Sequence, residues 1–100
     1  MTLTFPESQV ALMQEAIEHW GIPAQVDQCV EECAELILAL HKHEKRTRRT
    51  DTRAAVLDEM ADVEMMLAQM RLCYGISDAE LEERVAVKFG KMEGYLRGEV

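Results

Sequence analysis

The sequence predicts an all-α protein, a four-helix bundle-like domain, and three observations support that fold class. Only two prolines and five glycines interrupt 100 residues. The long stretches between them are rich in Ala, Leu, Met and Glu, which favour helix. Apolar residues make up 48% of the chain, enough for the hydrophobic core of one ordinary domain. We therefore expect one domain over residues 1–100, with helices joined by short connections and packed antiparallel.

The predicted helices cover, in order, residues 7–20, 23–45, 52–74 and 78–97. In the first, apolar residues recur at helical spacing: Val10, Met13, Ile17 and Trp20. Gly21 is expected to end this helix, as glycine commonly does. Pro23 suits the first turn of a helix and is expected to begin the second.

The third and fourth helices are predicted from the residues at their ends. Asp51 or Thr52 is expected to cap the third helix, and Gly75 is expected to end it. Ser77 is followed three residues later by Glu80, which is the spacing of a capping box. The fourth helix is therefore expected to start directly after Ser77.

Several classes of protein are excluded by the sequence. The longest apolar run is only a few residues, far short of a membrane span, and the first nine residues lack the features of a signal peptide. Cys29 and Cys33 stand one helical turn apart, which suits small buried hydrophobes better than a disulfide framework. No Cys/His quartet supports a zinc site. We expect a cytoplasmic protein with no membrane partner.

The net charge of −8 argues against stable nucleic-acid binding. The charge is unevenly distributed, however, because residues 42–53 carry six basic side chains against two acidic ones: Lys42, Lys45, Arg46, Arg48, Arg49 and Arg53 against Glu44 and Asp51. Two interpretations remain open for this segment. It is either a solvated connection between helices or a basic flap that covers a polyanionic ligand.

Pairs of acidic residues three positions apart are candidates for a site, because such residues lie side by side on a helix. The chain has four of them: Glu15/Glu18, Glu32/Glu35, Glu59/Asp62 and Glu80/Glu83. With 19 acidic residues, chance alone gives about 3.5 such pairs, so the spacing decides nothing. The residues around each pair separate them instead.

Two of these pairs project from apolar helix faces. On a helical wheel, Glu59 lies within a stripe of five apolar or small residues: Ala55, Val63, Met66, Met70 and Cys73. Asp62 flanks the same stripe. Glu32 similarly lies among Cys29, Leu36 and Ala39, with Glu35 beside it and Glu31 at the edge. The other two pairs belong to polar, solvated faces.

Four carboxylates in one cleft repel one another, since two unit charges 4 Å apart interact by roughly 4 kcal/mol at an effective dielectric of 20. Protonation, basic partners or divalent cations relieve that repulsion. Carboxylates without His or Cys suit Mg²⁺, with Mn²⁺ as the alternative, and no Glu-x-x-His motif supports a di-iron bundle. The competing interpretation is that these side chains meet water or Lys and Arg.

The segment "EECAE" at residues 31–35, followed after 23 residues by "EMAD" at 59–62, resembles the acidic signature of the MazG-like superfamily. These proteins are all-α nucleoside triphosphate pyrophosphohydrolases. The flanking segments "VLDEMADVEMML" and "VAVKFGKMEGYL" are also similar to that family. The resemblance extends over roughly residues 20–97.

This resemblance implies a helical bundle that assembles as a homodimer or homotetramer. It also implies Mg²⁺-dependent hydrolysis of a (d)NTP to the nucleoside monophosphate and pyrophosphate. The residues that match the family's metal ligands are Glu32, Glu35, Glu59 and Asp62. Glu31 or Glu32 is expected to orient or deprotonate the attacking water, and the resemblance does not choose between them.

Further residues are candidates for substrate binding. Lys88 and Lys91, on one helical face, are assigned to the phosphates, although solvated charges beside the core explain them equally well. Gln25 and Gln28 share the carboxylate face and are candidates for the base or ribose, or are ordinary polar residues of a helix start.

The function expected first is a housecleaning or pool-balancing NTP pyrophosphohydrolase. Within the superfamily, a phosphoribosyl-ATP pyrophosphatase or a dimeric dUTPase-like enzyme are alternatives. Two alternatives lie outside the superfamily. One is a non-catalytic oligomeric scaffold or binding module, including an antitoxin-like partner, and the other is a metal-sensing domain. A P-loop mechanism is excluded because the chain has no Walker A motif.

Overall fold

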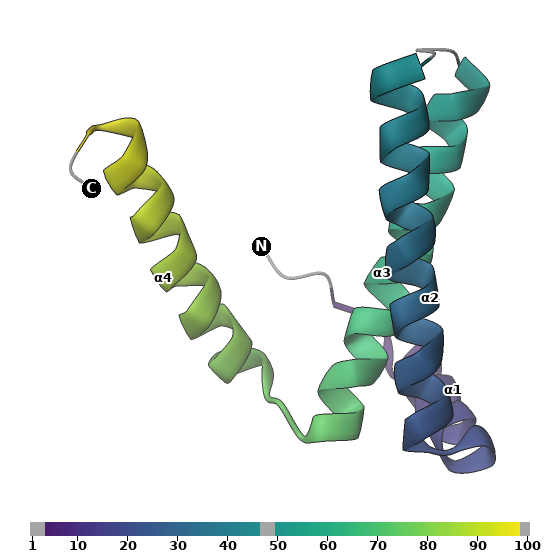
Figure 1. The fold of residues 1–100 in the computed structure, drawn as a ribbon. Coiled ribbons are helices and arrows are strands. Elements are labelled where there is room, and N and C mark those ends of the chain that lie inside the picture. The colour runs from purple at the N-terminus through teal and green to yellow at the C-terminus, as the bar shows by residue number, and fades with distance from the viewer. Residues whose placement is uncertain (1–3, 47–49, 99–100) are drawn as a thin grey trace.

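The computed structural model describes residues 4–46 and 50–98, and this part of the chain contains helices and turns but no strand (Figure 1). The predicted all-α class is confirmed. Its elements are α1 (Glu7–Trp20), α2 (Ile22–His41), the π-helical segment η1 (Lys42–Arg46), α3 (Thr50–Tyr74) and α4 (Asp78–Leu96). No helix in these residues is long and apolar enough to cross a membrane.

α1 and α2 meet at a single residue, Gly21. Its backbone has φ 87° and ψ 157°, a combination that is essentially restricted to glycine. The Gly21 amide donates a hydrogen bond to the Ile17 carbonyl at 2.8 Å, which ends α1 at the predicted position. Pro23 then lies in the first turn of α2, where its missing N–H costs nothing.

The other helix ends agree with the predictions in part. The capping box is confirmed, because the Glu80 amide donates to Ser77 Oγ at 3.1 Å and the Ser77 amide donates to a Glu80 carboxylate oxygen at 2.8 Å. These bonds hold the pKa of Glu80 below its ordinary value. The predicted cap of α3 is wrong, since the helix already begins at Thr50.

The basic segment at 42–53 is helical at residues 42–46 and again from Thr50 onward. The second predicted helix continues to Arg46, but as α-helix only to His41 and then as η1. Arg48 and Arg49, which contribute to the basic charge, lie outside the described residues. The choice between a solvated connection and a flap over a polyanion therefore stays a prediction.

Three helices pack together, and the fourth stands apart. α2 and α3 lie side by side along most of their length, and α1 packs against both of them at one end (Figure 1). Within the described residues α4 packs against none of the other helices. The single chain therefore does not close the expected four-helix bundle.

The turn between α3 and α4 has a defined geometry. Gly75, at φ 63°, follows the last turn of α3, and the Ile76 amide donates to the Arg71 carbonyl at 2.9 Å. Arg71 Nε lies 3.7 Å from a carboxylate oxygen of Asp78, the first residue of α4. These contacts and the capping box start α4 in a direction that leads away from α2 and α3.

The chain by itself buries little. Among the residues that the structure describes, no side chain is fully buried, and the buried hydrophobic residues are Met13, Cys29, Met66 and Ala68. The accessible surface is 7799 Å², whereas about 5,800 Å² is expected for a compact monomer of 11.4 kDa. The radius of gyration is 16.2 Å, against about 13 Å for a compact domain of 100 residues. The fold is thus open along α4.

Candidate metal centre

The α2–α3 pair brings together three of the four predicted metal ligands. One carboxylate oxygen each from Glu32, Glu59 and Asp62 lies within 4.8 Å of the other two. All three residues are half-buried, because they project from the faces on which α2 and α3 pack. We call these three residues the acid cluster. Its oxygens are close enough to share one divalent cation.

Two oxygens of the acid cluster have no hydrogen-bond partner in the described residues. They are Glu32 Oε2 and Glu59 Oε2, and both are shielded from solvent. The other oxygen of Glu32 accepts a hydrogen bond from Gln28 Nε2 at 2.8 Å. Buried carboxylate oxygens without partners are costly and rare, so relief for these two atoms has to come from protonation or from a shared cation.

The pKa values of two acidic residues on α2 also reflect crowding of negative charge at the acid cluster. Burial raises the pKa of Glu32, and repulsion by Glu35 and Asp62 adds to that effect. The pKa of Glu35 is raised chiefly by the neighbouring charge of Glu59 and then by lost hydration. No Lys or Arg side chain in the described residues pairs with these carboxylates. Of the three ways to relieve repulsion, protonation and a cation remain.

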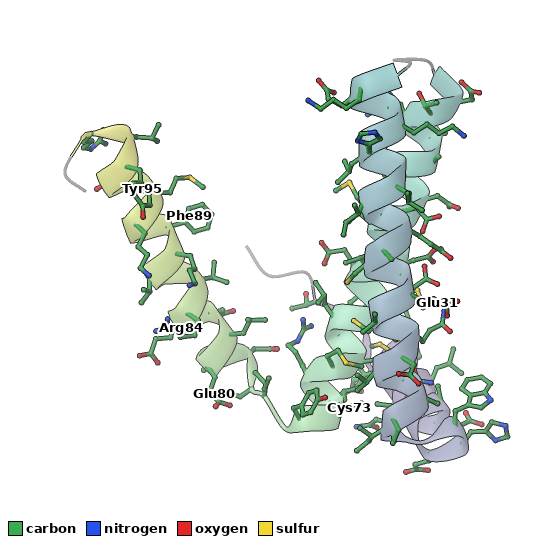
Figure 2. All side chains as sticks on the ribbon, in the orientation of Figure 1. Glu31, Cys73, Glu80, Arg84, Phe89 and Tyr95 are labelled. Carbon is green, nitrogen blue, oxygen red and sulfur yellow. The ribbon has the colours of Figure 1, made fainter. Side chains whose placement is uncertain are left out.

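The remaining predicted acids lie at the edge of the acid cluster. Glu35 is exposed and lies beside Glu59, one turn of α2 beyond Glu32. Glu31 is also exposed on α2 (Figure 2), and its charge contributes to the raised pKa of Glu35. Glu35 thus borders the acid cluster directly, and Glu31 borders Glu35.

The predicted phosphate-binding residues are not brought to the acid cluster within one chain. Lys88 and Lys91 lie exposed on α4, which does not pack against α2 or α3. Figure 2 shows Arg84 and Tyr95 on the same separate helix. An assignment of Lys88 and Lys91 to the phosphates therefore requires that α4 of another copy approach the acids.

The two candidate glutamines have different surroundings. Gln28 is exposed and orients Glu32 through its hydrogen bond, so it contacts a predicted metal ligand directly. Gln25 is only 6% exposed, near the start of α2. Neither position contradicts the expected role in substrate binding.

Sequence reasoning missed one buried polar residue, Gln69 on α3. It is 6% exposed, and its Oε1 has no hydrogen-bond partner in the described residues. Gln69 stands seven residues after Asp62, which is two helical turns and nearly the same face. That spacing was readable from the sequence, but a search for charged residues alone passes over an amide.

Comparisons with protein-family models, with curated proteins and with solved structures find no match for this chain. The resemblance to the MazG-like superfamily therefore rests on the motif residues themselves. Independently of any resemblance, the acid cluster offers hard oxygen ligands on half-buried side chains of α2 and α3, which is the donor set that Mg²⁺ and Mn²⁺ favour.

Proposed function

We propose that this chain is a Mg²⁺-dependent nucleoside triphosphate pyrophosphohydrolase that converts a (d)NTP to the monophosphate and pyrophosphate. The observation that carries the proposal is the acid cluster, in which Glu32, Glu59 and Asp62 converge from two helices and have no basic partner among the side chains that the structure describes. The match of these residues to the MazG-like acidic signature supports it. A role in balancing or cleaning nucleotide pools follows from that activity.

The chemistry assigned to each residue follows from its position. The acid cluster would hold Mg²⁺, or Mn²⁺ as the alternative, with Glu35 beside it. Such a cation neutralises charge on phosphate oxygens, and this reaction depends mostly on positioning and charge neutralisation. Glu31 or Glu32 would accept the proton of the water that attacks the α-phosphorus. The bond to pyrophosphate then breaks, and pyrophosphate leaves.

A homo-oligomer, dimeric or tetrameric, is part of this proposal. The chain exposes about 2,000 Å² more than a compact monomer of its mass, which is within the range that one partner loses in a large obligate interface. Along α4, which packs against no other helix in the described residues, apolar residues repeat every three or four positions: the half-buried Leu81 and Val85 and the exposed Phe89, Met92 and Leu96. A second copy would cover this stripe and bring Lys88 and Lys91 to the acids.

The direct test is a nucleotide screen. We expect the purified chain with Mg²⁺ to release pyrophosphate and a monophosphate from at least one NTP or dNTP, including dUTP and phosphoribosyl-ATP. Separate assays for pyrophosphate and for orthophosphate distinguish this cleavage from stepwise removal of the terminal phosphate. A full screen with no hydrolysis in Mg²⁺ or Mn²⁺ would favour the alternative, a non-catalytic oligomeric scaffold, which the exposed stripe on α4 also fits.

A second prediction concerns metal and pH. The pKa values of Glu32 and Glu35 are raised above the ordinary value of 4.5. The folded chain therefore binds protons more readily than the unfolded chain, and without metal its stability increases as pH falls from neutral toward that range. Mg²⁺ competes with those protons. Millimolar Mg²⁺ is therefore expected to raise the melting temperature by several degrees near pH 7.5, and much less near pH 5.

Differential scanning calorimetry at matched ionic strength measures this effect, with KCl replacing MgCl₂ in the control. An equal shift at both pH values would point to binding elsewhere than at these carboxylates. No shift at either pH would remove the metal centre from the proposal.

A further inference from the structure

A cavity of about 730 Å³ lies between α1 and α3, outside the acid cluster. Its wall is mostly apolar and aromatic, with one buried amide: Phe5, Leu12, Met13, Trp20, Met65 and Gln69. Cavities that bind small molecules have volumes of roughly 300–1,000 Å³ and this mixture of apolar walls with few polar groups. The metal chemistry proposed above does not use this cavity.

Gln69 is the buried polar residue of the cavity wall, and the other polar residues that line it are exposed: Gln9, Glu15 and His19. Its side chain lines the cavity and is 94% buried, and its Oε1 accepts no hydrogen bond from the described residues. An amide oxygen left unpaired in an apolar environment reduces stability. Oε1 itself is shielded in this conformation, so a ligand with a hydrogen-bond donor at this end of the cavity would satisfy that oxygen only after the Gln69 side chain turns toward it.

The position of Gln69 relates the cavity to the acid cluster. Glu59, Asp62 and Gln69 lie along one stripe of α3, because they are separated by three and seven residues. Asp62 and Gln69 are about 10.5 Å apart along the helix axis. That separation suits a nucleotide, in which the sugar stands between the phosphates and the base.

We propose that the α1–α3 cavity binds the heterocyclic base of the nucleotide and that Gln69 hydrogen-bonds to the edge of that base. This inference rests on the proposed function, since it assumes that the phosphates are held at the acid cluster. The Gln69 amide offers both a donor and an acceptor, as the edge of a base requires. Trp20 and Phe5 provide the aromatic surface on which bases stack.

The competing occupant of the cavity is an apolar helix of a second copy. Such a helix would fill the apolar wall but would leave Gln69 Oε1 without a donor. Trp20 is 63% exposed at the cavity, with its ring edge-on to His19 at a centroid distance of 5.0 Å. An exposed indole beside a buried, unpaired amide matches a planar polar ligand better than it matches an aliphatic side chain.

The test uses Trp20, which is the only tryptophan of the chain. We expect at least one of the four common deoxynucleosides, without phosphate or metal, to quench its fluorescence in a saturable way at millimolar concentration or below. Free deoxynucleosides make no use of the acid cluster. Glu59→Gln is therefore expected to bind them as the unmodified chain does.

Gln69→Met provides the decisive variant, because it removes the amide and nearly preserves the volume of the side chain. It is expected to weaken deoxynucleoside binding by at least about tenfold and to raise KM more than it lowers kcat. Its melting temperature without ligand should stay the same or rise, since an unpaired buried amide is lost. Gln14→Met, at an exposed position of α1 that does not line the cavity, is the matched control.

Three results would overturn this proposal. The first is quenching by deoxynucleosides that does not saturate or does not exceed the quenching of free N-acetyltryptophanamide, and the second is that Gln69→Met binds deoxynucleosides as tightly as the unmodified chain. The third is that Trp20 in the oligomer is shielded from acrylamide and its fluorescence does not respond to deoxynucleosides. The last result would assign the cavity to a second copy. Failure of the proposed function gives a different pattern, in which deoxynucleosides bind through Gln69 but no nucleotide is hydrolysed. Hydrolysis that Gln69→Met leaves unchanged would instead remove the base site alone.

Discussion

Replacing Glu59 by Gln is expected to lower nucleotide hydrolysis by at least about a hundredfold, while helical content and oligomer size stay unchanged. Glu59 contributes a ligand atom to the acid cluster, and its Oε2 is buried without a partner. The substitution keeps the shape of the side chain but removes the charge that would hold Mg²⁺. Pyrophosphate release, circular dichroism and light scattering measure the three properties.

The same variant is expected to change stability in the opposite direction. The charge of Glu59 is the main cause of the raised pKa of Glu35, so its removal relieves repulsion inside the fold. Without metal, Glu59→Gln should therefore melt at a higher temperature than the unmodified chain, and Mg²⁺ should add little. A loss of activity through misfolding would instead lower the melting temperature.

Glu64→Gln is the matched control for this experiment. Glu64 is exposed on α3 and lies outside the acid cluster, so its substitution should leave turnover and the Mg²⁺ response unchanged. Substantial activity in Glu59→Gln, or equal losses in both variants, would show that the acid cluster is not the catalytic metal site.

The second large effect is expected on assembly, from Phe89→Glu. Phe89 is 58% exposed in the middle of the apolar stripe of α4 (Figure 2). Burying a Phe side chain contributes about 1.5–3 kcal/mol, and an unpaired carboxylate in its place opposes burial further. Because a symmetric interface carries the change twice, association should weaken by at least about a hundredfold. Light scattering at micromolar concentration should show an oligomer become a monomer.

Val87→Glu is the control on the opposite face of α4. Val87 is 41% exposed, and it lies more than 120° around the helix from the centre of the stripe. The same apolar-to-acidic change at this position should leave the oligomer intact. A monomer already in the unmodified chain, or dissociation by both variants, would refute the proposal that the stripe of α4 is the contact between copies.

Helix positions were largely predictable because they depend on neighbours in the sequence. Gly21 ends α1 and the Ser77–Glu80 capping box starts α4 as expected, since each involves residues a few positions apart. The start of α3 was misplaced because Asp51 and Thr52 are plausible caps, yet the helix extends past them to Thr50. The sequence alone does not choose the first residue of this helix, because that choice depends on the backbone conformation of the residues before it.

The acid cluster was predictable for a related reason. A helical wheel places Glu32 and Glu59 on apolar faces, and two such faces pack against each other. The wheel could not distinguish the converging Asp62 from the more exposed Glu35, because that depends on the rotation of α2 against α3. The position of α4 could not be predicted either. Its apolar stripe is equally compatible with packing against helices of the same chain and with packing against a second copy.

The one-residue connection at Gly21 has a consequence for how this sequence tolerates change. Substituting Gly21 meets no crowding, since an added Cβ would come no nearer than 3.9 Å to Pro23. Its backbone geometry nevertheless makes alanine unfavourable there, by roughly 1–3 kcal/mol. Because this one residue connects the two helices, any residue placed there has to adopt the same backbone conformation to keep α1 packed against α2 and α3. Position 21 is therefore far more restricted in residue type than the exposed positions Trp20 and Ile22 on either side of it.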